Sequence, residues 1–323
     1  PMSMHKTMIE LVHNRITSTL SENSVNIPAD AVDILIIGHG SKDPNAKRSM
    51  EYIVDGIKSG YRNVSSCFLE IEEPNIEQGI LKCKNDNPEV LVVVFYFLHE
   101  GAHVKRDIYE DLNPALEKAN LQKVIITRHI GTDEKMIKIV EDVMVEFNKK
   151  IIKVLEKKSC KAKSITIKEN NVIDVEQESK ELGFVGKPTK VNTNLLNDII
   201  QKDFIPIVTP MGLDQKGQAF NINADVAAGA LSRSLKSRRL LLVTDVEGVL
   251  DKNEKLITEI RSKETEKLIN DQTIHGGMIP KIKTCIDAVN NGVRGVVIID
   301  GRKPHSILFE LFSDLGAGTL IRK

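Results

Sequence analysis

Residues 90–97 read Val-Leu-Val-Val-Val-Phe-Tyr-Phe, an unbroken run of apolar and aromatic side chains. Such a run, rich in β-branched residues, is typical of a strand that is buried on both faces of a parallel sheet. Around it, segments with helical periodicity alternate with shorter apolar runs. The helical segments are 46–59, 75–86, 104–118 and 133–149, and the apolar runs are 32–37, 64–69 and 123–127. This alternation predicts a doubly wound α/β domain with a parallel sheet.

The second half of the chain also alternates helix and strand patterns, but no internal repeat relates it to the first half. Periodicity predicts helices at 193–202, 223–235, 263–270, 277–291 and 304–312. Apolar runs predict strands at 204–208, 240–244, 295–299 and 318–322, and turn residues at 214–217 predict a hairpin. We therefore expect a second, partial α/β domain of a different kind.

Composition narrows the classes of function. The 323 residues suit two domains, and 41% of them are hydrophobic, enough for two buried cores. The 45 basic and 45 acidic side chains cancel, aromatic residues make up 4% and tryptophan is absent, which argues against nucleic-acid binding. No apolar run is long enough to cross a membrane and no secretory signal pattern is present, so we expect a cytoplasmic protein. Its four scattered cysteines are then expected to be free thiols.

The patterns divide the chain into four parts. Residues 1–32 contain one amphipathic helix, and residues 33–148 contain the strand–helix alternation of the first domain. Residues 149–170 are rich in lysine, which indicates a solvated helix end and a linker, with a nucleic-acid-binding arm as the alternative. Residues 171–323 form the second domain.

Histidines follow two strands of the first predicted sheet. His39 comes directly after the run at 32–37, in Gly-His-Gly-Ser, and His103 follows the run at 90–97, in Gly-Ala-His-Val-Lys-Arg-Asp. The run at 64–69 leads into Glu-Ile-Glu-Glu-Pro. Ligands of open parallel sheets bind beyond the carboxyl ends of the strands. Imidazole suits divalent cobalt, nickel and iron and can accept a proton near neutral pH. The spacing alone leaves two alternatives, a metal site and structural or exposed histidines.

These three motifs, in this order, resemble the CbiX-type sirohydrochlorin chelatases over about residues 33–148. The resemblance implies insertion of a divalent metal (Co²⁺ or Ni²⁺, with Fe²⁺ as an alternative) into sirohydrochlorin by paired histidines. His39 would be a metal ligand and the proton acceptor, and His103 a second ligand. Family members of this length pair as homodimers, so we expect a homodimer. The residues expected to lie against the tetrapyrrole are Glu73, Leu98, His99, Glu100, Gly101, Ala102 and His103.

Five further motifs follow one another in the second half. They are Leu-Gly-Phe-Val-Gly at 182–186, Asn-Ile-Asn-Ala-Asp at 221–225, Thr-Asp-Val-Glu-Gly-Val-Leu at 244–250, Gly-Gly-Met-Ile-Pro-Lys at 276–281 and Asp-Gly-Arg at 300–302. This ordered set resembles N-acetylglutamate kinase over about residues 160–323. Phosphoryl transfer needs charge neutralisation and fixed geometry, and a glycine-rich approach to a helix amino terminus favours bound anions.

The kinase resemblance implies roles for individual residues. Lys281 matches the lysine that stabilises the transferring phosphoryl group, Asp225 the aspartate that orients the catalytic lysines, and Asn221 the asparagine that binds acetylglutamate. ATP with Mg²⁺ and N-acetylglutamate are the ligands that it implies. The residues that match nucleotide contacts are Asp245, Val246, Glu247, Gly248, Val249, Leu250, Thr273, Ile274 and His275.

The sequence has no counterpart of the amino-terminal lobe of that kinase family. The lobe carries glycine-rich phosphate-binding turns, a second catalytic lysine and an arginine for acetylglutamate, whereas the first 37 residues here contain no glycine. We therefore expect nucleotide binding with poor or absent kinase turnover. Without the lobe, apolar helix faces of the second domain should stay uncovered.

Three functional hypotheses follow from these motifs. The leading one is a sirohydrochlorin metal chelatase that carries a partial kinase domain. The second is ATP-dependent phosphorylation of N-acetylglutamate, with the missing lobe supplied by another chain. The third is a non-catalytic fusion whose second half is a nucleotide-binding or oligomerisation scaffold.

Overall fold

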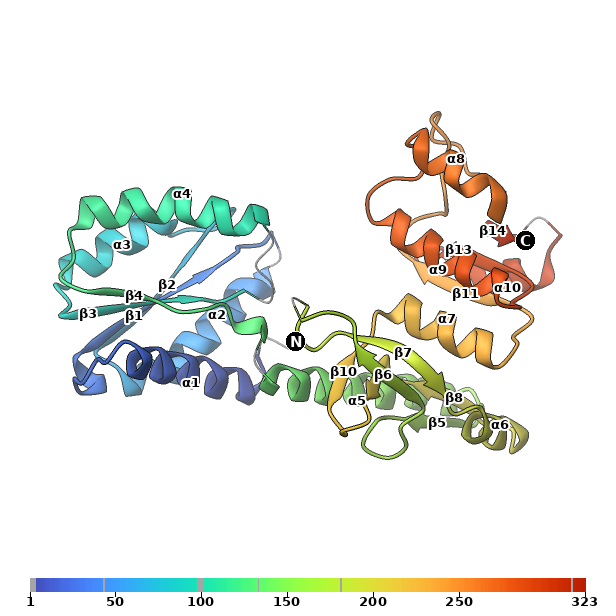
Figure 1. The fold of residues 1–323 in the computed structure, drawn as a ribbon, viewed down its shortest axis with the longest axis horizontal. Helices are drawn as coiled ribbons and strands as arrows, with labels where there is room; N and C mark the ends of the chain where they lie inside the picture. Colours follow the sequence, from blue (N-terminus) through green and yellow to red (C-terminus); the bar gives the residue numbers. More distant parts are fainter. Residues whose placement is uncertain (1–3, 43, 98–101, 133, 181, 315) are drawn as a thin grey trace. The chain divides into compact units, whose positions relative to one another are not determined.

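The computed structural model describes residues 4–42, 44–97, 102–132, 134–180, 182–314 and 316–323 (Figure 1). The chain forms two compact units, Pro1–Met144 and Val145–Lys323. Helix α5 (Glu134–Glu156) contains the division between them, so it contributes side chains to both. None of the described helices is long and apolar enough to cross a membrane.

The first unit is built on a parallel sheet. Its strands are β1 (Val32–Gly38), β2 (Asn63–Phe68), β3 (Val90–Phe95) and β4 (Val124–Ile126). They lie in the order β2-β1-β3-β4 and all neighbours pair in parallel. This order confirms the predicted doubly wound sheet. Since the chain adds β2 on one side of β1 and β3 on the other, the topological switch point lies between β1 and β3.

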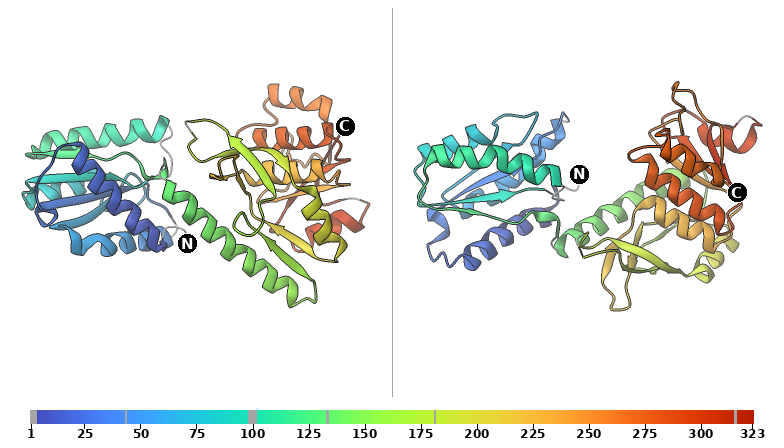
Figure 2. Two further views of the ribbon diagram at one scale, coloured as in Figure 1. Left: turned by 60° about the horizontal axis from the view of Figure 1, so that its bottom comes forward. Right: turned by 45° about the horizontal axis from the view of Figure 1, so that its top comes forward.

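Helices cover both faces of this sheet (Figures 1 and 2). Alternate residues of β1 point to opposite faces, so Ile34 and Ile36 join one core cluster while Leu35 and Ile37 join the other. The first cluster also contains side chains of α1 (Lys6–Glu22), α2 (Pro44–Ile57) and α5. The second contains side chains of α3 (Ile76–Asn85) and α4 (Ala102–Ala119). The run of apolar residues in β3 is therefore buried from both sides, as its sequence predicts.

The helix predicted within residues 1–32 is α1. It is an integral part of the first core, because Leu11, Val12 and Ile16 are fully buried. The hydroxyl of Tyr61 forms a hydrogen bond of 3.0 Å with Nδ1 of His13, which ties α1 to the turn before β2. Burial raises the pKa of Tyr61 to about 12, so this phenol keeps its proton at neutral pH.

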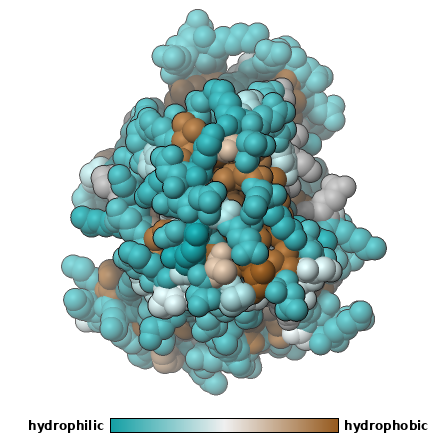
Figure 3. Space-filling model, turned by 90° about the vertical axis from the view of Figure 1, so that its left-hand side faces the viewer, coloured by the Kyte–Doolittle hydropathy of each residue, from teal (hydrophilic) through white to brown (hydrophobic). Residues whose placement is uncertain are grey.

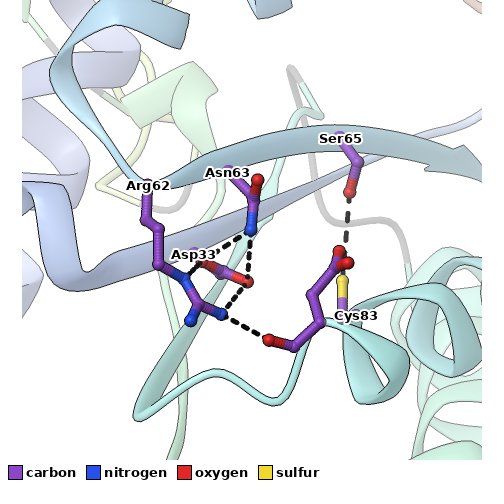
Figure 4. Close-up of polar contacts among 6 residues, drawn as sticks. Asp33, Arg62, Asn63, Ser65 and Cys83 are labelled. Carbon is purple, nitrogen blue, oxygen red and sulfur yellow. Dashed lines mark hydrogen bonds and ion pairs between the residues drawn. The ribbon is translucent and has the colours of Figure 1, made fainter.

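A buried ion pair joins the amino-terminal ends of β1 and β2 (Figure 4). The carboxylate of Asp33 accepts hydrogen bonds of 2.6 and 2.8 Å from Nε and Nη2 of Arg62. The side chain of Asp33 is 2% exposed, and the amide of Asn63 also donates to it. Arg62 further donates to the backbone carbonyl of Asp86, after α3. The network fixes this end of the sheet.

The side of the protein drawn in Figure 3 is mainly hydrophilic, with smaller hydrophobic areas.

The second unit contains three sheets. The first pairs β5 (Ala162–Ile165) with β8 (Ile205–Val208) in parallel. The second has the order β10-β9-β6-β7, from β6 (Ile173–Gln177), β7 (Gly186–Val191), β9 (Met211–Leu213) and β10 (Ala219–Asn221). The third has the order β11-β13-β14-β12, from β11 (Leu240–Thr244), β12 (Glu259–Arg261), β13 (Val296–Asp300) and β14 (Gly318–Arg322). The helices are α6 (Thr193–Gln201), α7 (Ala224–Ser234), α8 (Thr265–Asn270), α9 (Met278–Asn290) and α10 (Ser306–Phe312).

Four strands of this unit, β5, β6, β7 and β12, were not predicted from the sequence. The segment 149–170, predicted as a helix end and linker, holds the end of α5 and all of β5. The side chain of Asn148 is buried and donates to the Ile207 carbonyl (2.8 Å) and to Ser164 Oγ (3.2 Å), which holds α5 against both strands. Strand β7 contains Pro188, which an edge strand tolerates because its outer side needs no donor. These strands lack long apolar runs, so only their pairing reveals them.

Helix α10 has its polar side toward the protein. Glu310 is buried and accepts a hydrogen bond of 2.7 Å from Arg239 and one of 3.0 Å from the backbone N–H of Ala317. The large apolar side chains face outward, and Phe312 is 83% exposed. Helix α10 therefore exposes an apolar face to solvent. Its exposed members are Ile307, Leu308, Phe309, Leu311 and Phe312.

We expect Asp33→Ala to destabilise the first unit by about 2–3 kcal/mol, because Arg62 loses its buried partner but can still reach water. All four tyrosines lie in the first unit and the chain has no tryptophan, so tyrosine fluorescence follows that unit alone. Urea unfolding measured by this signal checks the value. The control is Lys118→Ala, which removes the exposed ion pair with Glu77 and should change stability by less than about 1 kcal/mol. Equal changes in both variants would contradict a structural role of Asp33.

Candidate functional site

A cleft of about 700 Å³ opens at the carboxyl end of β11 in the second unit. It has the size of a site for a small molecule or cofactor. Its walls come from the end of β11 with the loop and turn after it, from the loop after α8, and from the first turn of α9. The lining residues are Thr244, Asp245, Val246, Gly248, Val249, Leu250, Asp251, Lys252, Glu254, Gln272, Thr273, His275, Gly277, Met278 and Lys281.

Local hydrogen bonds hold both loops of the cleft. In the first loop, Oδ1 of Asp251 accepts hydrogen bonds from the backbone N–H groups of Asn253 (2.8 Å) and Lys255 (2.9 Å). In the second, the carboxylate of Asp271 accepts a hydrogen bond of 3.0 Å from the backbone N–H of Thr273. Hydrogen bonds from Thr273 lower the pKa of Asp271, so the carboxylate of Asp271 stays ionised at neutral pH. The loops thus present their side chains to the cleft from fixed turns.

Lys281 is the cation that lines the cleft from α9. Its Nζ lies 2.6 Å from Oδ2 of Asp225, and the two side chains are 18% and 29% exposed. Asp225 stands in the first turn of α7, where Asn223 caps the helix by accepting from the N–H groups of Asp225 and Val226. A carboxylate is favoured at that position by the helix dipole. The packing of α7 against α9 therefore orients the ammonium group through Asp225.

The amino terminus of α9 also faces the cleft. Gly276, with φ of +54°, precedes the helix, and Gly277 at its start makes no side-chain capping bond. The backbone N–H groups of Met278 and Ile279 donate to the carbonyls of His275 and Gly276 at 3.2 Å each, and Pro280 has no N–H. The positive end of the helix dipole still favours an anion at this position. The cleft thus places a lysine and a helix amino terminus together.

The structure brings most of the predicted nucleotide contacts to this cleft. The predicted residues that line it are Asp245, Val246, Gly248, Val249, Leu250, Thr273, His275 and Lys281. Two others lie elsewhere: Glu247 pairs with Lys303 at 2.6 Å, and Ile274 is buried in the core beneath α9. Asn221, expected at acetylglutamate, is not among the lining residues. It ends β10, where its backbone N–H donates to the Phe184 carbonyl.

Several residues of the cleft were not found from the sequence. Asp251, Lys252 and Glu254 come from a turn, and Gln272 from a helix end, so no motif marks them. Only their position after the Thr-Asp-Val-Glu-Gly-Val-Leu motif or before the Gly-Gly motif points toward the site. Asn223 could have been identified, because asparagine before an Ala-Asp helix start is a common amino-terminal cap.

The Asp-Gly-Arg motif at 300–302 lies beside the end of β11, which forms one wall of the cleft. The backbone N–H of Gly301 donates to the Thr244 carbonyl at 2.7 Å, so the ends of β13 and β11 are joined. Arg302 donates from Nε and Nη2 to the two carboxylate oxygens of Asp300, at 2.9 Å each. These bonds, led by the side-chain hydrogen bonds, lower the pKa of Asp300 to about 2. The motif therefore shapes the wall rather than lining the cleft.

A second candidate site lies at the switch point of the first sheet. The exposed ring of His39, directly after β1, makes an edge contact with Phe97, after β3, at a centroid distance of 6.5 Å. Gly40 has φ of +88° and lies so close to the Glu70 carbonyl that a side chain has no space there. The backbone N–H of Glu70 donates to the His39 carbonyl at 3.0 Å. The loops after β1 and β2 are therefore packed together beside the imidazole.

The structure describes only part of the predicted chelatase site. Glu73 is exposed, and its carboxylate accepts a hydrogen bond of 3.2 Å from the backbone N–H of Asn75. Leu98, His99, Glu100 and Gly101 lie outside the described residues, as do the side chains of Ala102 and His103 at the start of α4. Among the described residues, no three histidine, cysteine, aspartate or glutamate side chains are grouped as a metal site requires.

The sequence matches two protein families over overlapping ranges. Residues 99–300 match the amino acid kinase family, and residues 33–146 match the CbiX family. Acetylglutamate kinase of Pelagibacter ubique (strain HTCC1062) is 54% identical over 212 residues, which cover 66% of this chain and 74% of that protein. A match of this length begins before residue 160. The kinase similarity therefore extends further toward the amino terminus than the motifs indicate.

Solved structures with a similar fold are more distant in sequence. The smu.665 protein of Streptococcus mutans UA159 has a TM-score of 0.51 at 21% identity, over 91% of this chain and 99% of that chain. N-acetylglutamate synthase of Neisseria gonorrhoeae, solved with coenzyme A and N-acetyl-glutamate, has a TM-score of 0.53 at 17% identity. That match covers 96% of this chain and 62% of the synthase. These two likenesses concern the fold alone.

We expect Arg302→Ala to raise the pKa of Asp300 from about 2 toward the ordinary value near 3.9. The folded-state pKa is depressed, so the contribution of Asp300 to stability is present above pH about 4 and is lost as the pH falls toward 2. A ¹³C NMR titration of the aspartate carboxyl groups, with Asp300 assigned from the Asp300→Asn spectrum, measures both values. A wild-type pKa near 3.9 would contradict the bidentate pair.

Proposed function

This chain belongs to the amino acid kinase family, and we propose that its second unit binds ATP and transfers the γ-phosphoryl group to N-acetylglutamate. The observation that carries the proposal is the cleft in which Lys281, paired with Asp225, stands beside the amino terminus of α9. The 54% identity to an acetylglutamate kinase supports the substrate class.

In this proposal each group at the cleft has a separate task. The positive end of the α9 dipole attracts the phosphate oxygens, and the ammonium group of Lys281 neutralises the charge that spreads over the transferring phosphoryl group. Asp225 holds that ammonium in place, so it need not reorient during the reaction. The apolar side chains of Val246, Leu250 and Met278 exclude water from part of the bound nucleotide.

ATP enters such clefts as its Mg²⁺ complex, and the cleft has carboxylates for this ion. Asp245 and Asp251 line it and offer the oxygen ligands that Mg²⁺ prefers. Because the described residues offer no group of three ligands, the ion would be held mainly by the nucleotide phosphates. Bound there, Mg²⁺ would neutralise phosphate charge.

We expect the chain to bind ATP but to transfer the phosphoryl group inefficiently by itself. The chain covers 74% of the length of the Pelagibacter relative, and the motifs expected of the kinase family's amino-terminal lobe, glycine-rich turns and a second lysine, are not recognised in its sequence. Phosphoryl transfer requires charge neutralisation on both the attacking and the leaving side. We propose that the second unit supplies the nucleotide side, and that efficient transfer requires a lobe from another chain.

A chelatase activity is the second candidate, and the match of residues 33–146 to the CbiX family favours it. We propose that His39 and His103 bind Co²⁺ or Ni²⁺ and accept the protons that leave sirohydrochlorin as the metal enters. His39 stands at the switch point of the sheet, where open α/β sheets bind ligands. In a homodimer, a second subunit would enclose this large substrate from the side opposite His39.

We expect Lys281→Ala to lower phosphoryl transfer by about 10²–10³-fold, because charge stabilisation in the transition state is lost. ATP affinity should fall by less than about tenfold, since the α9 amino terminus remains. ADP release with acetylglutamate and calorimetric titration with ATP–Mg²⁺ measure the two effects. The control is Lys283→Ala, an exposed lysine of the same helix outside the cleft, which should match wild type. Wild-type protein that binds no ATP would refute the kinase proposal.

We expect His39→Ala and His103→Ala each to abolish insertion of Co²⁺ or Ni²⁺ into sirohydrochlorin, followed by the change in visible absorption. Each variant removes one of the paired imidazoles that are proposed to hold the metal. His305→Ala, in the second unit, is the matched control and should leave the rate unchanged. Wild-type insertion no faster than the uncatalysed reaction would reject this second function.

A further inference from the structure

Gln272 occupies a backbone conformation that normally favours glycine. It follows Asp271, the carboxyl-terminal cap of α8, and has φ of +63°. A residue with a β-carbon is disfavoured in this left-handed region, by about 1 kcal/mol, whereas glycine is not. A glutamine at this position therefore lowers the stability of the fold relative to glycine.

Left-handed residues end several helices of this chain, but Gln272 differs in what surrounds it. Lys236, with φ of +50° after α7, is exposed and outside the cleft. Gln272 is exposed as well, but it lines the cleft together with Asp245 and Lys281. Glu254, with φ of +60°, lines the same cleft from the opposite loop. Two long polar side chains on disfavoured backbone thus face one cavity.

The turn that carries Gln272 is held firmly from beneath. The backbone N–H of Gln272 donates to the Ile269 carbonyl at 3.1 Å, and that of Ile274 donates to the Leu268 carbonyl at 2.8 Å. Ile274 is 1% exposed and anchors the turn in the core. The carboxylate of Asp271 fixes the N–H of Thr273. Gln272 therefore lines the cleft from a rigid support, which lowers the entropic cost of using its side chain.

We propose that the carboxamide of Gln272 hydrogen-bonds the base of the bound nucleotide and selects adenine. This inference rests on the proposed nucleotide binding and adds a specificity-determining residue to it. A carboxamide carries one acceptor and two donors, and glutamine pairs with the N6 amino group and the neighbouring ring nitrogen of adenine. In this arrangement Lys281 and the positive end of the α9 dipole meet the phosphates, and Gln272, on the neighbouring turn, meets the base.

The decisive variant is Gln272→Gly, because it removes the carboxamide and the backbone strain together. In the full chain, the Kd of ATP should rise about fivefold, whereas the Kd of inosine triphosphate, which lacks the N6 amino group, should stay within twofold. The midpoint of thermal unfolding of the second unit, followed by circular dichroism, should rise by about 1–3 °C. Weaker binding in a more stable protein cannot result from damage to the fold.

Lys236→Gly is the matched control. It relieves the same kind of strain at a helix end outside the cleft, so it should raise the unfolding midpoint and leave both Kd values unchanged. Gln272→Asn, which keeps a carboxamide and suits left-handed backbone, should retain part of the preference for ATP. If Gln272→Gly binds ATP as tightly as wild type, Gln272 only ends α8 and the inference is wrong. If wild-type protein binds no ATP at all, the proposed function fails with it.

Discussion

Parallel strand pairing at the centre of each unit determines where its polar side chains can meet. β1 and β3 pair in the first unit and β11 and β13 in the second, and in each pair both strands end at the same edge. Such strands expose their carboxyl ends to one crevice. His39 and Phe97 meet there in the first unit, and Thr244 and Gly301 in the second. Both candidate sites therefore follow from the same constraint, although their chemistry differs.

The geometry of the kinase-type cleft depends further on how closely α7 and α9 approach. Gly229 on α7 allows this, because a β-carbon there would lie 3.1 Å from Thr284 on α9. The approach brings Asp225 to within 2.6 Å of Lys281 and leaves both side chains partly exposed at the cleft. An ion pair of this kind adds little to stability, because water competes with it. Its effect is positional, since it fixes the ammonium group that lines the cleft.

The second unit also exposes apolar surface to solvent. β5 and β8 form a sheet of two strands, and α10 directs Phe309 and Phe312 outward while Glu310 faces inward. The Pelagibacter kinase contains a quarter of its length that this chain does not match. Exposure of an apolar helix face to water is unfavourable, and its burial against another surface would lower the free energy. The walls of the cleft are anchored in the core beneath α9.

The sequence by itself determined the elements whose signals are local. The apolar run of β3, the periodicity of α7 and α9 and the motifs around His39 and Lys281 follow from residue order, because burial on both faces and helical spacing leave patterns in one dimension. Only the tertiary structure decided the rest. β5 and β7 lack apolar runs, and Gln272 and Glu254 reach the cleft from turns, so their roles exist only through pairing and proximity. Such contacts join residues far apart in the chain, and no local pattern encodes them.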